Sequence, residues 1–131
     1  KADDAVGLVN MIGTTNKMFA LDHAGQYVTG TFSGSSCGAG ACPTTGPYTA
    51  CALVFCKYLA DQNWNNKHYT FNACRGDTWG TCGAGSPSGN LVSGARRLSS
   101  ASSPYNSWGF TMNTAGLISA YGTAPLPTPT Y

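Results

Sequence analysis

Histidine and aspartate are the residues from which a catalytic site in this chain would first be built. His23 and His68 are its two histidines, and a hydrolytic triad would need one of them beside a serine and a carboxylate. Asp3 and Asp4 are adjacent, but neighbouring residues of a helix point about 100° apart and do not form an acid/base pair. The sequence therefore predicts no catalytic residue and no enzyme. We expect His23 to lie at a helix end and His68 to begin a strand.

Six cysteines are the other chemically active residues, and their spacing favours disulfides. Short glycine- and serine-rich segments separate them, as in small proteins of oxidising compartments. Spacings of five, five and eight do not match the tight pairs of zinc ribbons, and no cysteine pair precedes the histidine of a covalent haem site. We predict no metal and no cofactor. The predicted disulfide cysteines are Cys37, Cys42, Cys51, Cys56, Cys74 and Cys82.

The cysteine pairing stays open at this point, because six cysteines allow 15 connectivities. Cys37 and Cys42 are near enough in sequence to pair locally. Cys74 and Cys82 are placed to tie a loop to the end of a predicted strand. Under any of these pairings, the expected location is extracellular or at the cell surface.

The composition indicates one loop-rich domain spanning residues 1–131. Charged residues make up 9% of the chain and glutamate is absent, a profile that favours short strands over a helical bundle. The net charge is +2, and Arg96 and Arg97 are the only adjacent basic residues, so no nucleic-acid-binding stripe is predicted. Because the sequence shows no signal peptide and no apolar run of 18 or more residues, we expect a soluble, mature or trimmed form.

One long amphipathic helix, from about residue 3 to residue 24, should position the rest of the chain. Gly25 follows it, where a left-handed helix cap prefers glycine. At roughly 1.5 Å per residue the helix is about 30 Å long. Met11 and Met18 form a second apolar line, which indicates either a second neighbour for the helix or two exposed methionines on an ordinary helix. The main stripe, with three- and four-residue spacings, is Ala5, Leu8, Val9, Ile12, Asn16, Phe19 and Ala20.

Short strands should follow in the region 25–121. Residues 26–32 permit an extended piece, 68–74 alternate clearly, and Gly94 weakens the segment 91–98. Residues 108–112 and 117–121 flank a turn with Gly116 and predict a hairpin. Residues 51–59 fit either a helical turn or a buried strand. The Pro- and Thr-rich tail 122–131 should be extended. The predicted fold is α+β, with the helix packed on a small antiparallel sheet of three to four strands and disulfide-stapled loops.

These elements occur in the order found in type IV pilins and pseudopilins. The stretch "AVGLVNMIGTTNKMFALDHAGQYVTG" resembles the second half of the pilin helix with its exit, and "CALVFCKYLADQNWNNKHYTFNA" is similar to the pilin segment that leads into the first central strand. The terminal "WGFTMNTAGLISAYG" resembles the pilin hairpin. The apolar N-terminal half-helix of the family, with its membrane anchor and acidic residue, is absent from this sequence.

The resemblance implies a structural subunit of an extracellular filament that works by self-assembly, in adhesion, motility or DNA uptake. Its partners would be copies of itself and, where the apolar half-helix is supplied separately, a second chain that carries it. Met11 and Met18 would then face other subunits. Leu8 and Ile12 are also candidate subunit contacts, although the resemblance equally implies that they pack on the subunit's own sheet.

The alternative hypothesis is a monomeric secreted binding module, such as an adhesin or effector. Trp64 and Trp79 lie in predicted loops, where aromatic rings can contact a ligand or pin the loop. Trp108 lies in a predicted strand and is expected to pack in the core. About 20 apolar residues upstream of Lys1, continuing the helix, would favour the filament subunit, whereas a cleaved secretory signal would favour the binding module.

Overall fold

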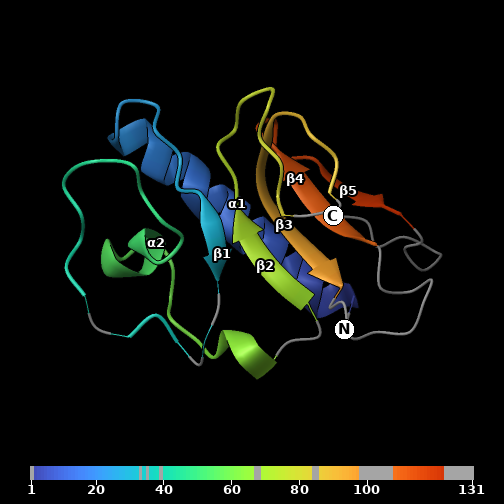
Figure 1. Ribbon diagram of the computed structural model, residues 1–131, viewed down its shortest axis with the longest axis horizontal. Coiled ribbons are helices and arrows are strands. Elements are labelled where there is room, and N and C mark those ends of the chain that lie inside the picture. The colour runs from blue at the N-terminus through green and yellow to red at the C-terminus, as the bar shows by residue number, and fades with distance from the viewer. Residues whose placement is uncertain are drawn as a thin grey trace.

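A computed structural model of the protein describes residues 2–32, 34, 36–38, 40–66, 69–83, 86–97 and 108–122. The helix α1 (Ala2–Asp22) crosses one face of an antiparallel sheet, and the chain between the first two strands extends to one side (Figure 1). The remaining elements are β1 (Gly30–Phe32), α2 (Ala52–Phe55), the 3-10 helix η1 (Trp64–Asn66), β2 (Tyr69–Ala73), β3 (Leu91–Arg97), β4 (Gly109–Asn113) and β5 (Ile118–Tyr121). His68 and the predicted tail beyond residue 122 lie outside the described residues.

The sheet has five strands in the order β1-β2-β3-β4-β5, so successive strands pair as a meander. The fold is therefore α+β, as predicted, but the prediction of three to four strands was too low. The edge strand β1 has only three residues, too few for an alternating pattern to distinguish it from a loop. The predicted hairpin is confirmed as β4 and β5, and Gly116 in its turn has a φ of 87°.

The core lies between α1 and the inner face of the sheet, where the helix contacts β2, β3 and β4. The predicted stripe of α1 is buried in full, including the polar Asn16. The largest buried side chains opposite the helix come from the strands and from the segment before β1: Val28, Phe71, Val92 and Phe110. A 21-residue helix is thus held by tertiary packing along most of its length.

The helix ends two residues before the predicted limit. Gly25 donates its backbone N–H to the carbonyl of Ala20 at 2.8 Å, the bond that closes a Schellman-type helix end. Ala24 and Gly25 both have positive φ, 57° and 84°. The predicted glycine at the helix exit is therefore confirmed, although the first left-handed position is occupied by Ala24.

Gly94 does not interrupt β3, which is the longest strand. A Cβ built on Gly94 would lie 2.6 Å from the Cβ of Cys82, which packs on the outer face of the sheet at that position. The glycine makes room for the disulfide between Cys74 and Cys82. A glycine inside a strand usually weakens it, but here close packing against Cys82 requires a residue without a side chain.

The disulfides join Cys37 to Cys51, Cys42 to Cys56, and Cys74 to Cys82. The bridge between Cys74 and Cys82 confirms the suggested loop tie, but the local pairing of Cys37 with Cys42 is wrong. Residues 51–59 contain a helical turn, α2, and Cys51 and Cys56 flank it. The Cys37–Cys51 and Cys42–Cys56 disulfides therefore fasten the loop after β1 to α2. The spacing of the cysteines in the sequence does not reveal this contact.

Candidate functional site

The clearest candidate site lies on the outer face of the sheet, opposite α1. In β2 the side chains of Phe71 and Ala73 enter the core, so alternation turns Asn72 to the outer face. Cys74, Cys82 and Leu91 form a small second core there, beneath the loop that joins β2 to β3. This loop and the β1 edge enclose a groove.

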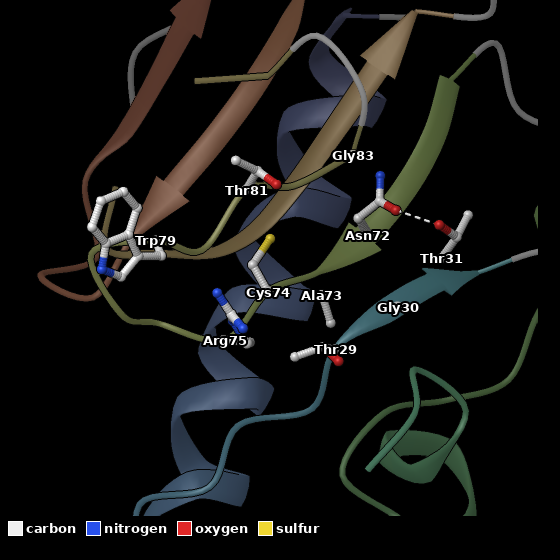
Figure 2. A pocket seen from close by; sticks show the side chains of 10 residues that line it. All are labelled: Thr29, Gly30, Thr31, Asn72, Ala73, Cys74, Arg75, Trp79, Thr81 and Gly83. Carbon is white, nitrogen blue, oxygen red and sulfur yellow. Dashed lines mark hydrogen bonds between the residues drawn. The ribbon is translucent and has the colours of Figure 1, made fainter. Parts of the chain in front are cut away.

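The groove has a volume of about 260 Å³. Figure 2 shows Trp79 at one side and Thr31 with Asn72 at the other, and Arg75 and Thr81 lie between them. The lining residues come from the β1 edge, β2 and the loop that follows it: Thr29, Gly30, Thr31, Asn72, Ala73, Cys74, Arg75, Trp79, Thr81 and Gly83. Most of the side chains are small or carry a hydroxyl, amide or guanidinium group.

Trp79 is 79% exposed, yet its backbone is fixed. The Asp77 carboxylate accepts the backbone N–H of Trp79 at 3.1 Å, and the Asp77 carbonyl accepts the N–H of Gly80 at 3.1 Å. The disulfide between Cys74 and Cys82 closes the loop around this turn. Such local bonds to Asp are typical of a stable turn. The indole is therefore presented to solvent on an ordered support.

The opposite wall of the groove is fixed by a hydrogen-bond chain. The Thr31 hydroxyl donates to Oδ1 of Asn72 at 2.6 Å, and Nδ2 of Asn72 donates to the carbonyl of Cys82 at 3.1 Å. Asn72 is buried, and both the oxygen and the nitrogen of its side-chain amide are hydrogen-bonded. These two bonds fix the orientation of the amide. Arg75 and Asp77 form an exposed ion pair at 3.5 Å, which adds little to stability.

Of the two tryptophans predicted as candidate ligand contacts, only Trp79 is exposed. Trp64 is 3% exposed and packs against Phe32, with the rings tilted and their centroids 4.4 Å apart. Trp64 is thus a core residue rather than a ligand contact. Trp108 is also buried, against Tyr69, as predicted. The residues Thr31, Asn72 and Arg75 of the groove were not predicted, because the sequence does not show that β1 and β2 are neighbours.

The outward face of α1 is a second exposed surface. Met11, Met18 and Leu21 are 44%, 52% and 85% exposed. Leu21 was not predicted, although it lies three residues after Met18 and so on the same side of the helix. Leu8 and Ile12 are 8% and 0% exposed, because they pack against the sheet of the same chain. They are core residues, so their side chains are not available for the predicted contact with another chain in this arrangement.

His23 lies at the end of α1, as predicted. Its ring stacks on Phe19 with the centroids 3.8 Å apart, and its Nδ1 lies 2.7 Å from the Phe19 carbonyl oxygen. Asp22 accepts a hydrogen bond from the Tyr58 hydroxyl, which raises the pKa of Tyr58. These contacts fasten the helix end to the segment after α2.

Gly34, Ser36 and Gly38 have the spacing of the G-x-S-x-G motif of serine hydrolases. That motif requires a sharp turn between a strand and a helix, whereas here the next helix begins at Ala52. Within the described ranges, no three His, Cys, Asp or Glu side chains are placed to hold a metal ion. In the same part of the chain, no helix has the length and apolar character needed to cross a membrane.

Comparisons of the chain with protein-family models, curated proteins and solved structures found no match. Functional inference therefore rests on the two surfaces described above, the outward face of α1 and the groove beside Trp79.

Proposed function

We propose that this protein is a structural subunit of an extracellular type IV pilus-like filament and acts by self-assembly. One observation carries the proposal: the long helix α1 buries one face on its own sheet and exposes uncharged apolar side chains on the other. Met11, Met18 and Leu21 form that outward line. Large apolar groups in a continuous exposed surface are typical of protein contacts.

The outward line has the geometry of a helix-packing surface. At 100° per residue, five of the exposed positions fall within about 80° of arc: Gly7, Met11, Thr14, Met18 and Leu21. The exposed polar residues Asp4, Asn10 and Asp22 border this arc. A Cβ on Gly7 would meet nothing within 4 Å, so the helix backbone is open to close approach there. Apolar residues seven apart with small residues between them favour another helix as the neighbour. A second copy of this chain supplies such a helix.

The three disulfides support an extracellular location, because disulfides form and persist in oxidising compartments. In a filament whose helices bundle at the centre, the opposite face of the sheet would form the outer surface. Adhesion, motility and DNA uptake are the activities that such an exposed surface serves.

Electron microscopy of filaments sheared from the native source, with mass spectrometry of the intact subunit, tests the proposal. We expect filaments that contain this chain, joined to or paired with an apolar helix. A monomer found only in the medium, with no filament, would remove the proposal and favour the secreted binding module.

The variant Met11→Glu tests the surface itself. A charge at the centre of a dry helix contact is costly, so the variant should not assemble. Met11 is 44% exposed in the subunit, so the charge does not disturb the core. The circular dichroism and thermal unfolding of the variant should therefore match those of the wild type. Met11→Leu keeps an apolar side chain and should assemble. Normal assembly of Met11→Glu would show that this line does not face other subunits.

A further inference from the structure

We propose that the groove beside Trp79 binds a neutral carbohydrate, with a sugar ring stacked on the indole. The inference concerns the outer face of the sheet and does not require filament formation. It rests on the exposure of Trp79, the polar groups that face it across the groove, and the rigidity of both walls.

The indole of Trp79 is the platform. Trp64 and Trp108 are buried in the core, whereas Trp79 is 79% exposed. Packing within the domain therefore accounts for the first two tryptophans but not for Trp79. An aromatic face carries negative charge density and attracts the weakly positive C–H groups of a sugar ring. Tryptophan is also the residue whose truncation most often costs binding energy at protein surfaces.

The groups across from Trp79 match sugar hydroxyls. Thr31 donates its hydroxyl hydrogen to Asn72, which leaves the Thr31 oxygen free to accept a hydrogen bond from a ligand. Thr29 and Thr81 add hydroxyls that both donate and accept. Arg75 lines the groove and supplies hydrogen-bond donors, and its ion pair with Asp77 offsets its charge. Alternating donors and acceptors suit a ligand that carries several hydroxyl groups.

A second groove continues the first. It has a volume of about 270 Å³ and shares Thr29 and Arg75 with the groove beside Trp79. Tyr27 lines it, and a Cβ on Gly76 would lie 2.8 Å from the Tyr27 ring, so this tyrosine packs directly against the Trp79 loop. Each groove is slightly smaller than the roughly 300–1,000 Å³ of sites for drug-sized ligands. Two such grooves in sequence fit successive units of an oligosaccharide.

Other ligand classes fit the groove less well. A nucleic acid would need several cations for its phosphates, whereas among the described residues Arg75 is the only cationic residue that lines either groove, and it is paired with Asp77. An apolar peptide would leave the threonine hydroxyls without partners. A neutral sugar uses both the aromatic face and the hydroxyls.

Rigidity of the walls favours binding, since little conformational freedom is lost when a ligand enters. The Trp79 loop is fixed by the Cys74–Cys82 disulfide, and Cys82 donates its N–H to the Ser86 hydroxyl at 2.9 Å. Gly89 donates its N–H to the carbonyl of Gly80 at 3.2 Å, which joins the two halves of the loop. Both walls of the groove are thus held by bonds within the protein.

The test is calorimetric titration of the monomeric domain with chitotriose, maltotriose and a panel of other neutral oligosaccharides, together with sialyllactose and oligothymidylate as charged probes. We expect a neutral oligosaccharide to bind with a Kd of about 1 mM or tighter. Trp79→Ala should weaken binding about tenfold or more, and Trp79→Phe less, because the aromatic face is partly kept. Leu117→Ala, which removes another exposed apolar side chain outside the groove, should bind as the wild type does.

Acrylamide quenching gives an independent readout in the wild type, because Trp79 is its one exposed tryptophan among three. A bound sugar should reduce the quenching. The proposal is overturned if no neutral oligosaccharide binds, if Trp79→Ala binds as tightly as the wild type, or if only a charged probe binds. Each of these results would leave the filament proposal untouched, since the titration uses monomer.

Discussion

Asn16 shows how one residue can organise the fold. Its side chain is fully buried on the inner face of α1, where Oδ1 accepts the backbone N–H of Val28 at 2.8 Å. Nδ2 lies within 3.1 Å of three carbonyl oxygens, those of Val28, Cys74 and Val92. One amide thus joins the helix to the segment before β1, to the end of β2 and to β3. Buried amides satisfied in this way specify a single arrangement of their neighbours.

We expect Asn16→Leu to lower the free energy of unfolding by about 3–5 kcal/mol, because it leaves several buried backbone groups without partners. Urea unfolding of the oxidised protein, followed by circular dichroism, measures the change. Asn10→Leu is the matched control, since Asn10 lies on the exposed side of the same helix, and it should change stability by less than about 0.5 kcal/mol. Equal losses in the two variants would show that the Asn16 bonds contribute nothing specific.

Among the elements, α1 and the sheet approach each other closely at Gly13. A Cβ there would lie 2.7 Å from Oγ of Ser93 and would overlap Sδ of Met112. The Ser93 hydroxyl cannot easily move, because it donates a hydrogen bond of 2.6 Å to the carbonyl of Val9. Gly13 is therefore a contact point between helix and sheet, and its lack of a side chain sets their separation.

Two glycines of the same helix should respond in opposite directions to alanine. Gly13→Ala should destabilise the protein by about 1–3 kcal/mol through overpacking. Gly7→Ala should stabilise it by about 0.5–1 kcal/mol, because Gly7 is exposed, meets nothing within 4 Å and gains helix propensity. Thermal unfolding of both variants measures the difference. Stabilisation by Gly13→Ala would contradict the close approach of α1 to β3 and β4.

The loop after β1 is fastened by a carboxylate as well as by disulfides. Oδ1 of Asp61 accepts the N–H of Cys37 at 2.8 Å, and Oδ2 accepts the N–H of Gly38 at 3.1 Å. These bonds, with that of Cys37 foremost, lower the pKa of Asp61 below its ordinary value of 3.8. The charged form is thus favoured in the folded protein.

The lowered pKa predicts the direction of a pH effect. The stabilisation by Asp61 should be complete above about pH 4, near the unfolded value, and should be lost as the pH falls through the lower folded value. Asp61→Asn removes the charge, so wild type and variant should differ in unfolding free energy at pH 7, and the difference should be smaller at pH 3. Urea titrations at both pH values measure this. A difference that is independent of pH would contradict the role of the carboxylate.

At the scale of the whole molecule, the two layers give the protein two different faces. The outward side of α1 carries the exposed apolar side chains of Met11, Met18 and Leu21, with the exposed Asp4 and Asp22 beside them. The opposite side of the sheet carries the groove with Trp79 and its polar lining. The first face suits contact with copies of the same chain and the second suits a ligand in solution. A filament built through the first face would leave the second exposed, so the two proposals are compatible but can fail separately.

The local elements follow from short-range patterns in the sequence. The spacing of apolar residues predicted α1, the glycine at its exit and the burial of Asn16 with the stripe, because helical periodicity is a local property. The alternation around Gly116 likewise predicted the hairpin of β4 and β5. The cysteines were recognised as disulfide partners from number and spacing alone.

Contacts between distant segments depend instead on tertiary packing. It paired Cys37 with Cys51 across 14 residues, added β1 to the sheet, and buried Trp64 while leaving Trp79 exposed. It also brought Thr31 to Asn72, 41 residues away, and so formed the wall of the groove. These outcomes depend on packing between segments that share no local pattern. Periodicity can show which face of an element is buried, but it does not specify the neighbour that covers it.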